Sequence, residues 1–172
     1  MDLGPLSNGD AYMGEDNFFW EELKTHPDYD EFWQKRNLLP HLKGKNTAVM
    51  TVGGWFDAED LYGPLNIYRT LEERAQGYNT LVMGPFGHGG WAREKGHHRH
   101  HHIYFGDSIA TFYQRNIEAR FFDHFLKGEA DGNTGLPEAY VYDTGIKEWR
   151  TFERWTPKRA TSQELFLQAA GL

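Results

Sequence analysis

Residues 47–54 read Thr-Ala-Val-Met-Thr-Val-Gly-Gly, and residues 80–85 read Thr-Leu-Val-Met-Gly-Pro. Both stretches are short and largely apolar, and each ends at glycine. Such runs are typical of strands that are buried on both faces, as in a parallel sheet. The sequence therefore predicts two buried strands, each followed by a loop.

Helical patterns follow both predicted strands. After the first strand, apolar residues recur at helical spacing at Leu61, Leu65, Tyr68 and Leu71. After the second, a long amphipathic helix is predicted from about Ser108 to Lys127, with Asp107 or Ser108 as its N-cap and Gly128 at its C-terminal end. The order strand, helix, strand, helix predicts an α/β fold with a parallel sheet.

The regions before and after these predicted elements differ from them in composition. Residues 1–45 are rich in tryptophan and charge and predict one or two short helices that pack on something larger. A polar, turn-rich linker follows Gly128, and beyond it lie three strand candidates, residues 139–142, 149–152 and 164–167. These predict the beginning of a separate all-β module, because so few residues cannot close a sandwich or barrel alone.

Composition excludes several classes of protein. Aromatic residues make up 16% of the chain, which favours a folded protein over a disordered one. The net charge is −7 without a basic stripe, so we expect no nucleic-acid partner. The chain has no cysteine, so disulfides and thiolate chemistry are excluded. No apolar run approaches the roughly 18 residues that a membrane helix needs, so we expect no membrane partner.

Chemically able side chains follow both predicted strands. Asp57 lies in the loop after the first strand and His88 in the loop after the second. Ligands of open α/β sheets bind beyond the carboxyl ends of the strands, so both loops are expected to face one crevice. An aspartate followed by a histidine in this arrangement matches the last two members of a Ser, Asp, His triad. The alternative is that Asp57 caps a helix and His88 is an ordinary loop histidine.

Two further features of the sequence carry chemical interest. The run of residues 97–102, His-His-Arg-His-His-His, contains five imidazoles. We predict no metal site there, because a loop run rarely supplies ligands that are fixed by hydrogen-bonding partners. The three serines, Ser7, Ser108 and Ser162, all lie outside a Gly-x-Ser-x-Gly elbow. None of these serines is therefore expected to act as the nucleophile of such a triad.

Several motifs occur in the order found in one enzyme family. They are Gly54-Trp-Phe-Asp57-Ala-Glu59-Asp60-Leu-Tyr-Gly63, Gly84-Pro-Phe-Gly-His88, the upstream His26-Pro-x-Tyr29-Asp30-x-Phe32-Trp33-Gln34, and the downstream Tyr142-x-Thr144-Gly145-x-x-x-Trp149. With these motifs the chain resembles the CocE/NonD serine hydrolases, a group similar to the X-Pro dipeptidyl-peptidases, and within it the α-amino acid ester hydrolases. Phe86 stands where the family usually has Trp, and the first motif is shifted by one residue around its tryptophan.

The resemblance implies that the serine nucleophile lies outside this chain, which would be a C-terminal fragment. It also implies a fold and its boundaries. Residues 1–45 would be the end of a helical cap, residues 46–128 the C-terminal part of an α/β-hydrolase domain, and residues 129–172 the truncated beginning of a β jelly roll. It also implies that Asp57 is the triad acid, that His88 is the base, and that Glu59 and Asp60 belong to a carboxylate cluster that holds a substrate ammonium group. From the residues alone, this acidic pair is better explained as a favourable charge at a helix N-terminus.

The resemblance implies an activity for the parent protein. That activity is hydrolysis or transfer of acyl groups from α-amino acid esters or β-lactam-type amides through an acyl-enzyme. The alternatives are a broader CocE-like esterase, an X-Pro dipeptidyl-peptidase, or a non-catalytic remnant. No cofactor is expected, and the partner would be a small-molecule ester or amide. Only the resemblance suggests a homo-oligomeric, periplasmic or secreted parent, and the sequence itself leaves the compartment open.

Overall fold

The computed structural model describes residues 4–14, 16–44, 47–74, 77–128 and 133–166. The chain divides into two compact units, Met1–His41 and Leu42–Leu172, and each is described by itself.

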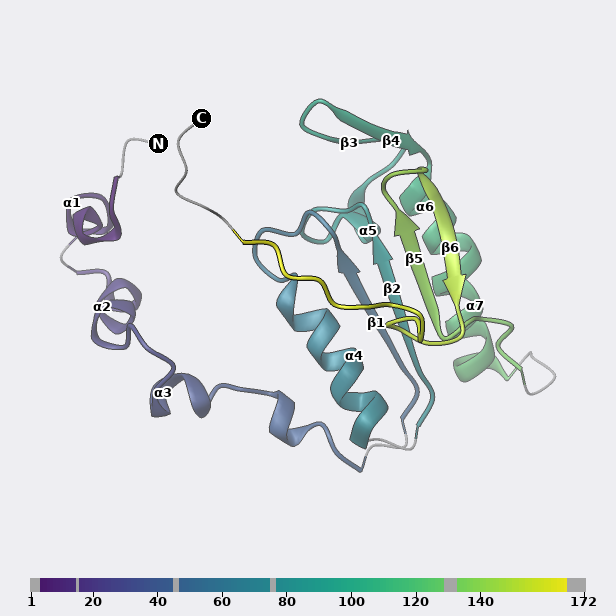
Figure 1. Ribbon diagram of the computed structural model, residues 1–172, viewed down its shortest axis with the longest axis horizontal. Helices are drawn as coiled ribbons and strands as arrows, with labels where there is room; N and C mark the ends of the chain where they lie inside the picture. Colours follow the sequence, from purple (N-terminus) through teal and green to yellow (C-terminus); the bar gives the residue numbers. More distant parts are fainter. Residues whose placement is uncertain (1–3, 15, 45–46, 75–76, 129–132, 167–172) are drawn as a thin grey trace. The chain divides into compact units, whose positions relative to one another are not determined.

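The first unit consists of short helices (Figure 1). They are η1 (Leu6–Asn8), α1 (Asp10–Met13), α2 (Phe18–Thr25), α3 (Glu31–Gln34) and η2 (Leu39–His41). Side-chain caps begin two of them: Asn17 accepts the backbone N–H of Trp20, and Asp30 accepts that of Phe32. The indole N–H of Trp20 donates to Asp10 at 2.6 Å, which links α1 to α2. Helices of one or two turns are marginal alone, so these caps and cross-links help to define them.

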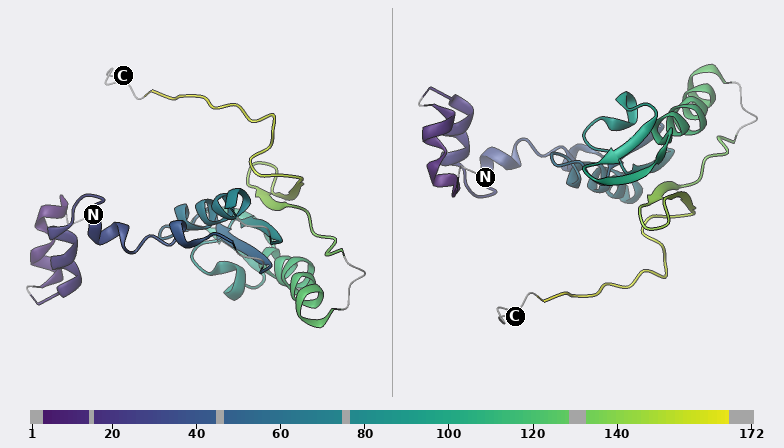
Figure 2. Two further views of the ribbon diagram at one scale, coloured as in Figure 1. Left: turned by 90° about the horizontal axis from the view of Figure 1, so that it is seen from below. Right: turned by 90° about the horizontal axis from the view of Figure 1, so that it is seen from above.

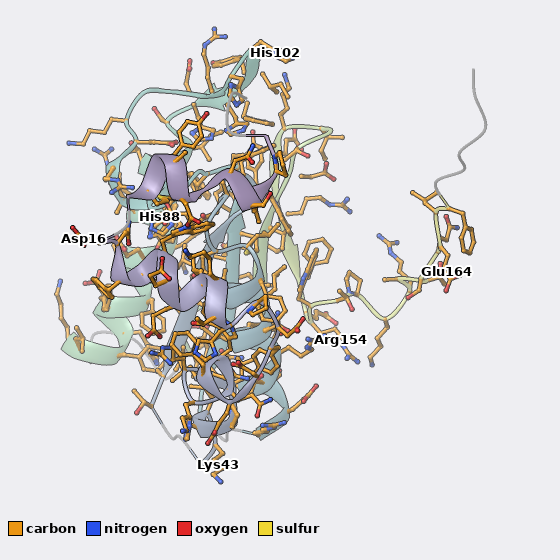
Figure 3. All side chains as sticks on the ribbon, turned by 90° about the vertical axis from the view of Figure 1, so that its left-hand side faces the viewer. Asp16, Lys43, His88, His102, Arg154 and Glu164 are labelled. Atoms are coloured by element: carbon orange, nitrogen blue, oxygen red, sulfur yellow. The ribbon has the colours of Figure 1, made fainter. Side chains whose placement is uncertain are left out.

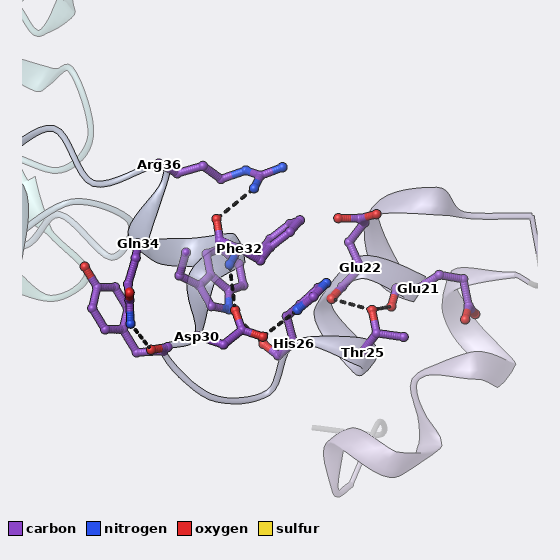
Figure 4. Close-up of polar contacts among 10 residues, drawn as sticks. Glu21, Glu22, Thr25, His26, Asp30, Phe32, Gln34 and Arg36 are labelled. Atoms are coloured by element: carbon purple, nitrogen blue, oxygen red, sulfur yellow. Dashed lines mark hydrogen bonds and ion pairs between the residues drawn. The ribbon is translucent and has the colours of Figure 1, made fainter.

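A small polar network connects α2 to α3 (Figure 4). His26 Nδ1 lies 2.6 Å from Asp30 Oδ2, and its ring stacks on Phe32 with the ring centroids 4.2 Å apart. The His26 carbonyl accepts the indole N–H of Trp33 at 2.8 Å. His26 therefore packs and hydrogen-bonds within this unit.

The second unit contains a four-stranded mixed sheet. Its strands are β1 (Val49–Gly54), β2 (Asn79–Gly84), β5 (Ala139–Asp143) and β6 (Glu148–Phe152), in the order β1-β2-β5-β6. The first three are parallel and β6 is antiparallel to β5. Both strands predicted from the apolar runs, β1 and β2, are thus confirmed. Strand β2 is buried along its whole length, whereas Val49, Met50 and Val52 of the edge strand β1 are only half-buried. A separate antiparallel hairpin joins β3 (His97–His100) to β4 (Ile103–Asp107).

Helices cover both faces of this sheet (Figures 1 and 2). Helix α4 (Tyr62–Arg74) packs through Tyr68 on one face. On the other face lies one continuous helical segment, made of α6 (Ile109–Tyr113), η3 (Gln114–Glu118), α7 (Ala119–Phe122) and η4 (Asp123–Lys127), in which η3 and η4 are π-helical. The short helix α5 (Gly90–Arg93) follows β2. The predicted α/β architecture and both of its long helices are therefore present.

The long helical segment differs from the prediction at its start. Ser108 has a left-handed backbone conformation, with φ of 55°, and its side chain makes no capping hydrogen bond. Asp107 is the last residue of β4. Ser108 therefore occupies the predicted N-cap position of α6, but its side chain does not provide the expected capping hydrogen bond. At the other end, Gly128 has φ of 66°, as expected of a helix-terminating glycine.

The predicted boundary after residue 128 also needs correction. Strand β5 pairs in parallel with β2, and β6 pairs with β5, so both continue the α/β sheet instead of opening a separate all-β module. The reason is that Ala139 and Val141 are buried in the same core cluster as Leu81 of β2. The third strand candidate also fails within the described part of the chain: residues 164–166 form no strand and Leu165 is 95% exposed. Leu167 lies outside the described residues.

Candidate active site

The loop after β1 holds Asp57 in a buried position. The Asp57 carboxylate Oδ1 accepts the backbone N–H groups of Glu59 at 2.9 Å and Asp60 at 3.0 Å. The loop can approach the β2 loop only because residue 54 is glycine, since a Cβ there would lie 2.2 Å from the Phe86 carbonyl oxygen. Asp57 is thus oriented by its own loop, and its second oxygen faces the neighbouring strand end.

His88 stands opposite this carboxylate, in the loop after β2. Its Nδ1 lies 3.1 Å from Asp57 Oδ2 and 3.3 Å from Oδ1. The predicted contact between the two side chains is therefore present. The histidine side chain is 52% exposed while that of Asp57 is 2% exposed, so a buried acid supports an accessible base. His88 is labelled among the side chains in Figure 3.

Electrostatics favour the ionised form of Asp57. Burial opposes ionisation of this carboxyl group and acts to raise its pKa. The backbone N–H groups of Glu59 and Asp60, and then His88, act in the opposite direction and outweigh burial. The pKa of Asp57 consequently lies below its usual value. A carboxylate that stays ionised can hold the Nδ1–H tautomer of His88, which leaves Nε2 free to accept a proton. The same carboxylate can then stabilise the imidazolium that forms.

The two neighbouring acidic residues occupy different positions. Glu59 is exposed, and its Oε2 lies 4.0 Å from His88 Nε2, the ring nitrogen that does not face Asp57. Asp60 caps α4, because its Oδ1 accepts the backbone N–H of Gly63 at 3.0 Å. Both explanations of the acidic pair therefore have some basis: helix capping fits Asp60, and proximity to the base fits Glu59.

The three serines lie away from the two strand-end loops in the sequence. Ser7 is in η1 of the first unit, Ser108 follows β4, and Ser162 is in the extended C-terminal stretch. The chain thus brings together an acid and a base on adjacent loops but places no serine on either loop.

The histidine run folds as a hairpin and not as a loop. Residues 97–100 form β3, and His102 lies in the turn that follows (Figure 3). Among the residues that the structure describes, no group of three or more His, Asp or Glu side chains is arranged to hold a metal ion. None of the described helices is long and apolar enough to cross a membrane.

Sequence reasoning missed one residue close to this site. His98 is buried, at 4% exposure, and contacts the β2 loop. Its position inside a run of histidines hid this, because the run resembles a polar surface segment. The alternation of β3 carried a weak signal, since only every second residue of an edge hairpin can face the core.

Comparison with known proteins identifies a family of hydrolases. The family profile described as X-Pro dipeptidyl-peptidase (S15 family) matches residues 6–90. Cocaine esterase from Rhodococcus sp. (strain MB1 Bresler) is 28% identical over 155 residues, which are 88% of this chain and 25% of that protein. The chain belongs to the CocE/NonD, S15-like hydrolase family.

Solved structures support the same assignment. An aminopeptidase from a marine sediment Thaumarchaeota archaeon superposes with a TM-score of 0.72 and 30% identity, over 91% of this chain and 26% of that chain. A selenomethionine-labelled α-amino acid ester hydrolase superposes with a TM-score of 0.74 and 25% identity, over 89% of this chain and 25% of that chain. This CocE/NonD chain therefore spans about a quarter of the length of its relatives.

Proposed function

We propose that this chain carries the acid, Asp57, and the base, His88, of a serine hydrolase whose nucleophile lies in a further part of the protein. The observation that carries the proposal is the 3.1 Å contact between His88 Nδ1 and the buried Asp57 carboxylate. The two residues come from neighbouring parallel strands, at the sheet edge where α/β enzymes bind ligands.

The proposed mechanism assigns a role to each of these two side chains. His88 Nε2 takes the proton of a serine hydroxyl as that oxygen attacks the substrate carbonyl, and later returns it to the leaving group. Asp57 stays ionised, fixes the Nδ1–H tautomer and stabilises the imidazolium. The serine forms an acyl-enzyme, which water then hydrolyses with the same base. The chemistry asked of this chain is therefore proton transfer and charge stabilisation.

The proposed substrates are α-amino acid esters or β-lactam-type amides with a free ammonium group. Support comes from Glu59, whose carboxylate lies 4.0 Å from His88 Nε2, and from the adjacent charge of Asp60. A cation bound there would relieve the repulsion between the two carboxylates. A broader esterase or an X-Pro dipeptidyl-peptidase is the alternative within the family, and a non-catalytic remnant is the alternative outside it.

The domain assignments remain part of this proposal. The first unit would be the end of a helical cap. A jelly roll would start only beyond β6, since β5 and β6 belong to the α/β sheet.

The test requires this chain within a protein that also supplies the N-terminal part of the family fold. We expect His88→Ala and Asp57→Asn each to reduce kcat on an amino acid ester by roughly three to four orders of magnitude. His102→Ala, at an exposed position in the β3–β4 turn, is the matched control and should retain full activity. Comparable activity in His88→Ala and the control would refute the triad assignment.

A further inference from the structure

His98 makes polar contacts on both sides of its ring although it is nearly inaccessible to solvent. It is the second residue of β3 and is 4% exposed. Its Nε2 contacts the carbonyl oxygen of Pro85, and its Nδ1 contacts Glu94 Oε2. A buried imidazole with two polar partners is a fixed structural element and not a surface residue.

The two partners of His98 flank the segment that contains His88. Pro85 directly follows β2, and Glu94 directly follows α5, so one ring connects the beginning and the end of residues 85–94. The Phe86 ring packs edge-on against His98, with the centroids 5.5 Å apart. His98 therefore fastens both ends of the loop that presents the proposed base.

The contacts indicate the protonation of this pair. A carbonyl and a carboxylate are both acceptors, whereas a neutral imidazole has a single N–H to donate. His98 satisfies both partners only if it donates from both nitrogens, or if Glu94 takes the proton instead. In the first case, both ring nitrogens of His98 carry a proton and Glu94 is its carboxylate partner in an ion pair.

The polar contact between these two side chains is an ion pair. Within the described part of the chain, His98 Nδ1 and Glu94 Oε2 are buried and face each other, and neither atom has a hydrogen-bond partner. The remaining surroundings of the ring are aromatic, with Phe86 on one side and Phe105 at a centroid distance of 5.9 Å. Glu94 supplies the charged contact to His98, and separating the two would leave both groups unsatisfied.

The Glu94 side chain packs closely against Gly90 and Phe86. A Cβ at residue 90 would lie 2.6 Å from Glu94 Oε1 and 3.1 Å from the Phe86 Cβ. The absence of a side chain at Gly90 lets the carboxylate fold back over α5 toward His98. The backbone N–H of Glu94 also donates to the Gly90 carbonyl at 2.9 Å, which closes the end of this helix.

We propose that His98, held as an imidazolium by Glu94, is a positioning residue for His88. It keeps residues 85–94 in the conformation that sets His88 Nδ1 against Asp57. The catalytic meaning of this inference rests on the proposed function, whereas the fastening of the loop does not.

The first test uses the 172-residue chain itself and nitrogen-edited NMR of its histidine rings at neutral pH. We expect two solvent-protected ring N–H protons on His98, and only the Nε2–H after Glu94→Gln, because an amide can turn its NH2 group toward Nδ1. His102→Gln, an exposed position in the same hairpin, should leave both signals intact. A single protected ring proton on His98 in the unmodified chain would overturn the proposal.

The second test measures hydrogen exchange in the loop that contains His88. We expect Glu94→Gln and His98→Gln to speed amide hydrogen exchange at Gly90 and Glu94 by about tenfold or more, and to broaden the Nδ1–H signal of His88. His102→Gln should change neither. If His98→Gln does not fold, Glu94→Gln still decides, since it removes one charge with almost no change in shape. Unchanged exchange in Glu94→Gln would refute the positioning role.

Activity measurements on the whole protein distinguish a failure of the proposed function from a failure of the positioning role of His98. In the whole protein, Glu94→Gln should lower kcat more than it changes KM, since the base is displaced and substrate contacts remain. If His88→Ala leaves activity intact, the proposed function fails while the NMR result on His98 still stands. If His88→Ala abolishes activity and Glu94→Gln leaves kcat unchanged, only the positioning role fails.

Discussion

The backbone N–H of Phe56 donates a hydrogen bond to the carbonyl of Phe86 over 3.0 Å. This bond joins the loops after β1 and β2, one residue before Asp57 and two residues before His88. The distance between the acid and the base is thus set by backbone pairing that continues the β1–β2 register beyond the last strand residues, Gly54 and Gly84. This backbone bond fixes the positions from which the side chains of Asp57 and His88 extend.

The charge of Glu59 should matter only for substrates that carry an ammonium group. In the whole protein, Glu59→Gln is expected to lower kcat/KM for an α-amino ester by roughly tenfold. The moderate size follows from the exposure of this carboxylate, at 74%, because water screens exposed charges. The des-amino ester serves as the control and should change little. Equal losses on both substrates would favour the broader esterase.

Two substitutions of Asp60 separate the effect of its helix cap on stability from the effect of its charge. Asp60→Ala removes the acceptor for the Gly63 N–H and should lower the free energy of unfolding by about 1 kcal/mol. Asp60→Asn keeps an acceptor and removes the charge, so the stability should stay close to that of the unmodified chain. Urea denaturation measures both. A loss of stability in Asp60→Asn as large as that in Asp60→Ala would show that charge, and not capping, holds this end of α4.

Asp57 should make stability depend on acid pH. Its pKa is lower in the folded state than in the unfolded state, so its contribution is present above the unfolded value, about 3.9, and is lost as the pH falls through the folded value. The free energy of unfolding should therefore fall more steeply on acidification in the unmodified chain than in Asp57→Asn. Denaturant titrations from about pH 6 to about pH 3 test this. Parallel curves would contradict it.

Glu138 should have the opposite effect. Burial is the main cause that raises its pKa; the 2.5 Å hydrogen bond from Tyr68 lowers it, and the neighbouring Glu72 raises it again. Because the folded-state pKa is raised, the protonated form favours folding, and stability is lost as the pH rises from the unfolded value of about 4.3 through the folded value. Over that window, Glu138→Gln should lose less stability than the unmodified chain.

A matched control for this prediction is Glu153→Gln, at an exposed position. Denaturant titrations of both variants between about pH 4 and about pH 7 provide the comparison. The slope for Glu153→Gln should follow that of the unmodified chain. A Glu138→Gln variant with the unmodified slope would show that the carboxyl group is not coupled to folding.

The sequence by itself determined the elements whose signal is local. The apolar runs predicted β1 and β2 because a strand buried on both faces must be apolar along its length. The spacing of apolar residues predicted α4 and the long segment from α6 to η4, since a helix needs one apolar face. Asp57 and His88 could be predicted as neighbours because parallel strands bring their carboxyl ends to one edge.

Only the tertiary structure decided which strands share a sheet and which polar residues are buried. The local pattern of residues 139–152 predicts two strands equally well in a jelly roll or in the α/β sheet, because pairing depends on the partner and not on the strand alone. The same pattern at residues 164–166 forms no strand. The burial of His98 and its contacts with Pro85 and Glu94 could not be predicted, because they depend on how β3 folds against the loop after β2.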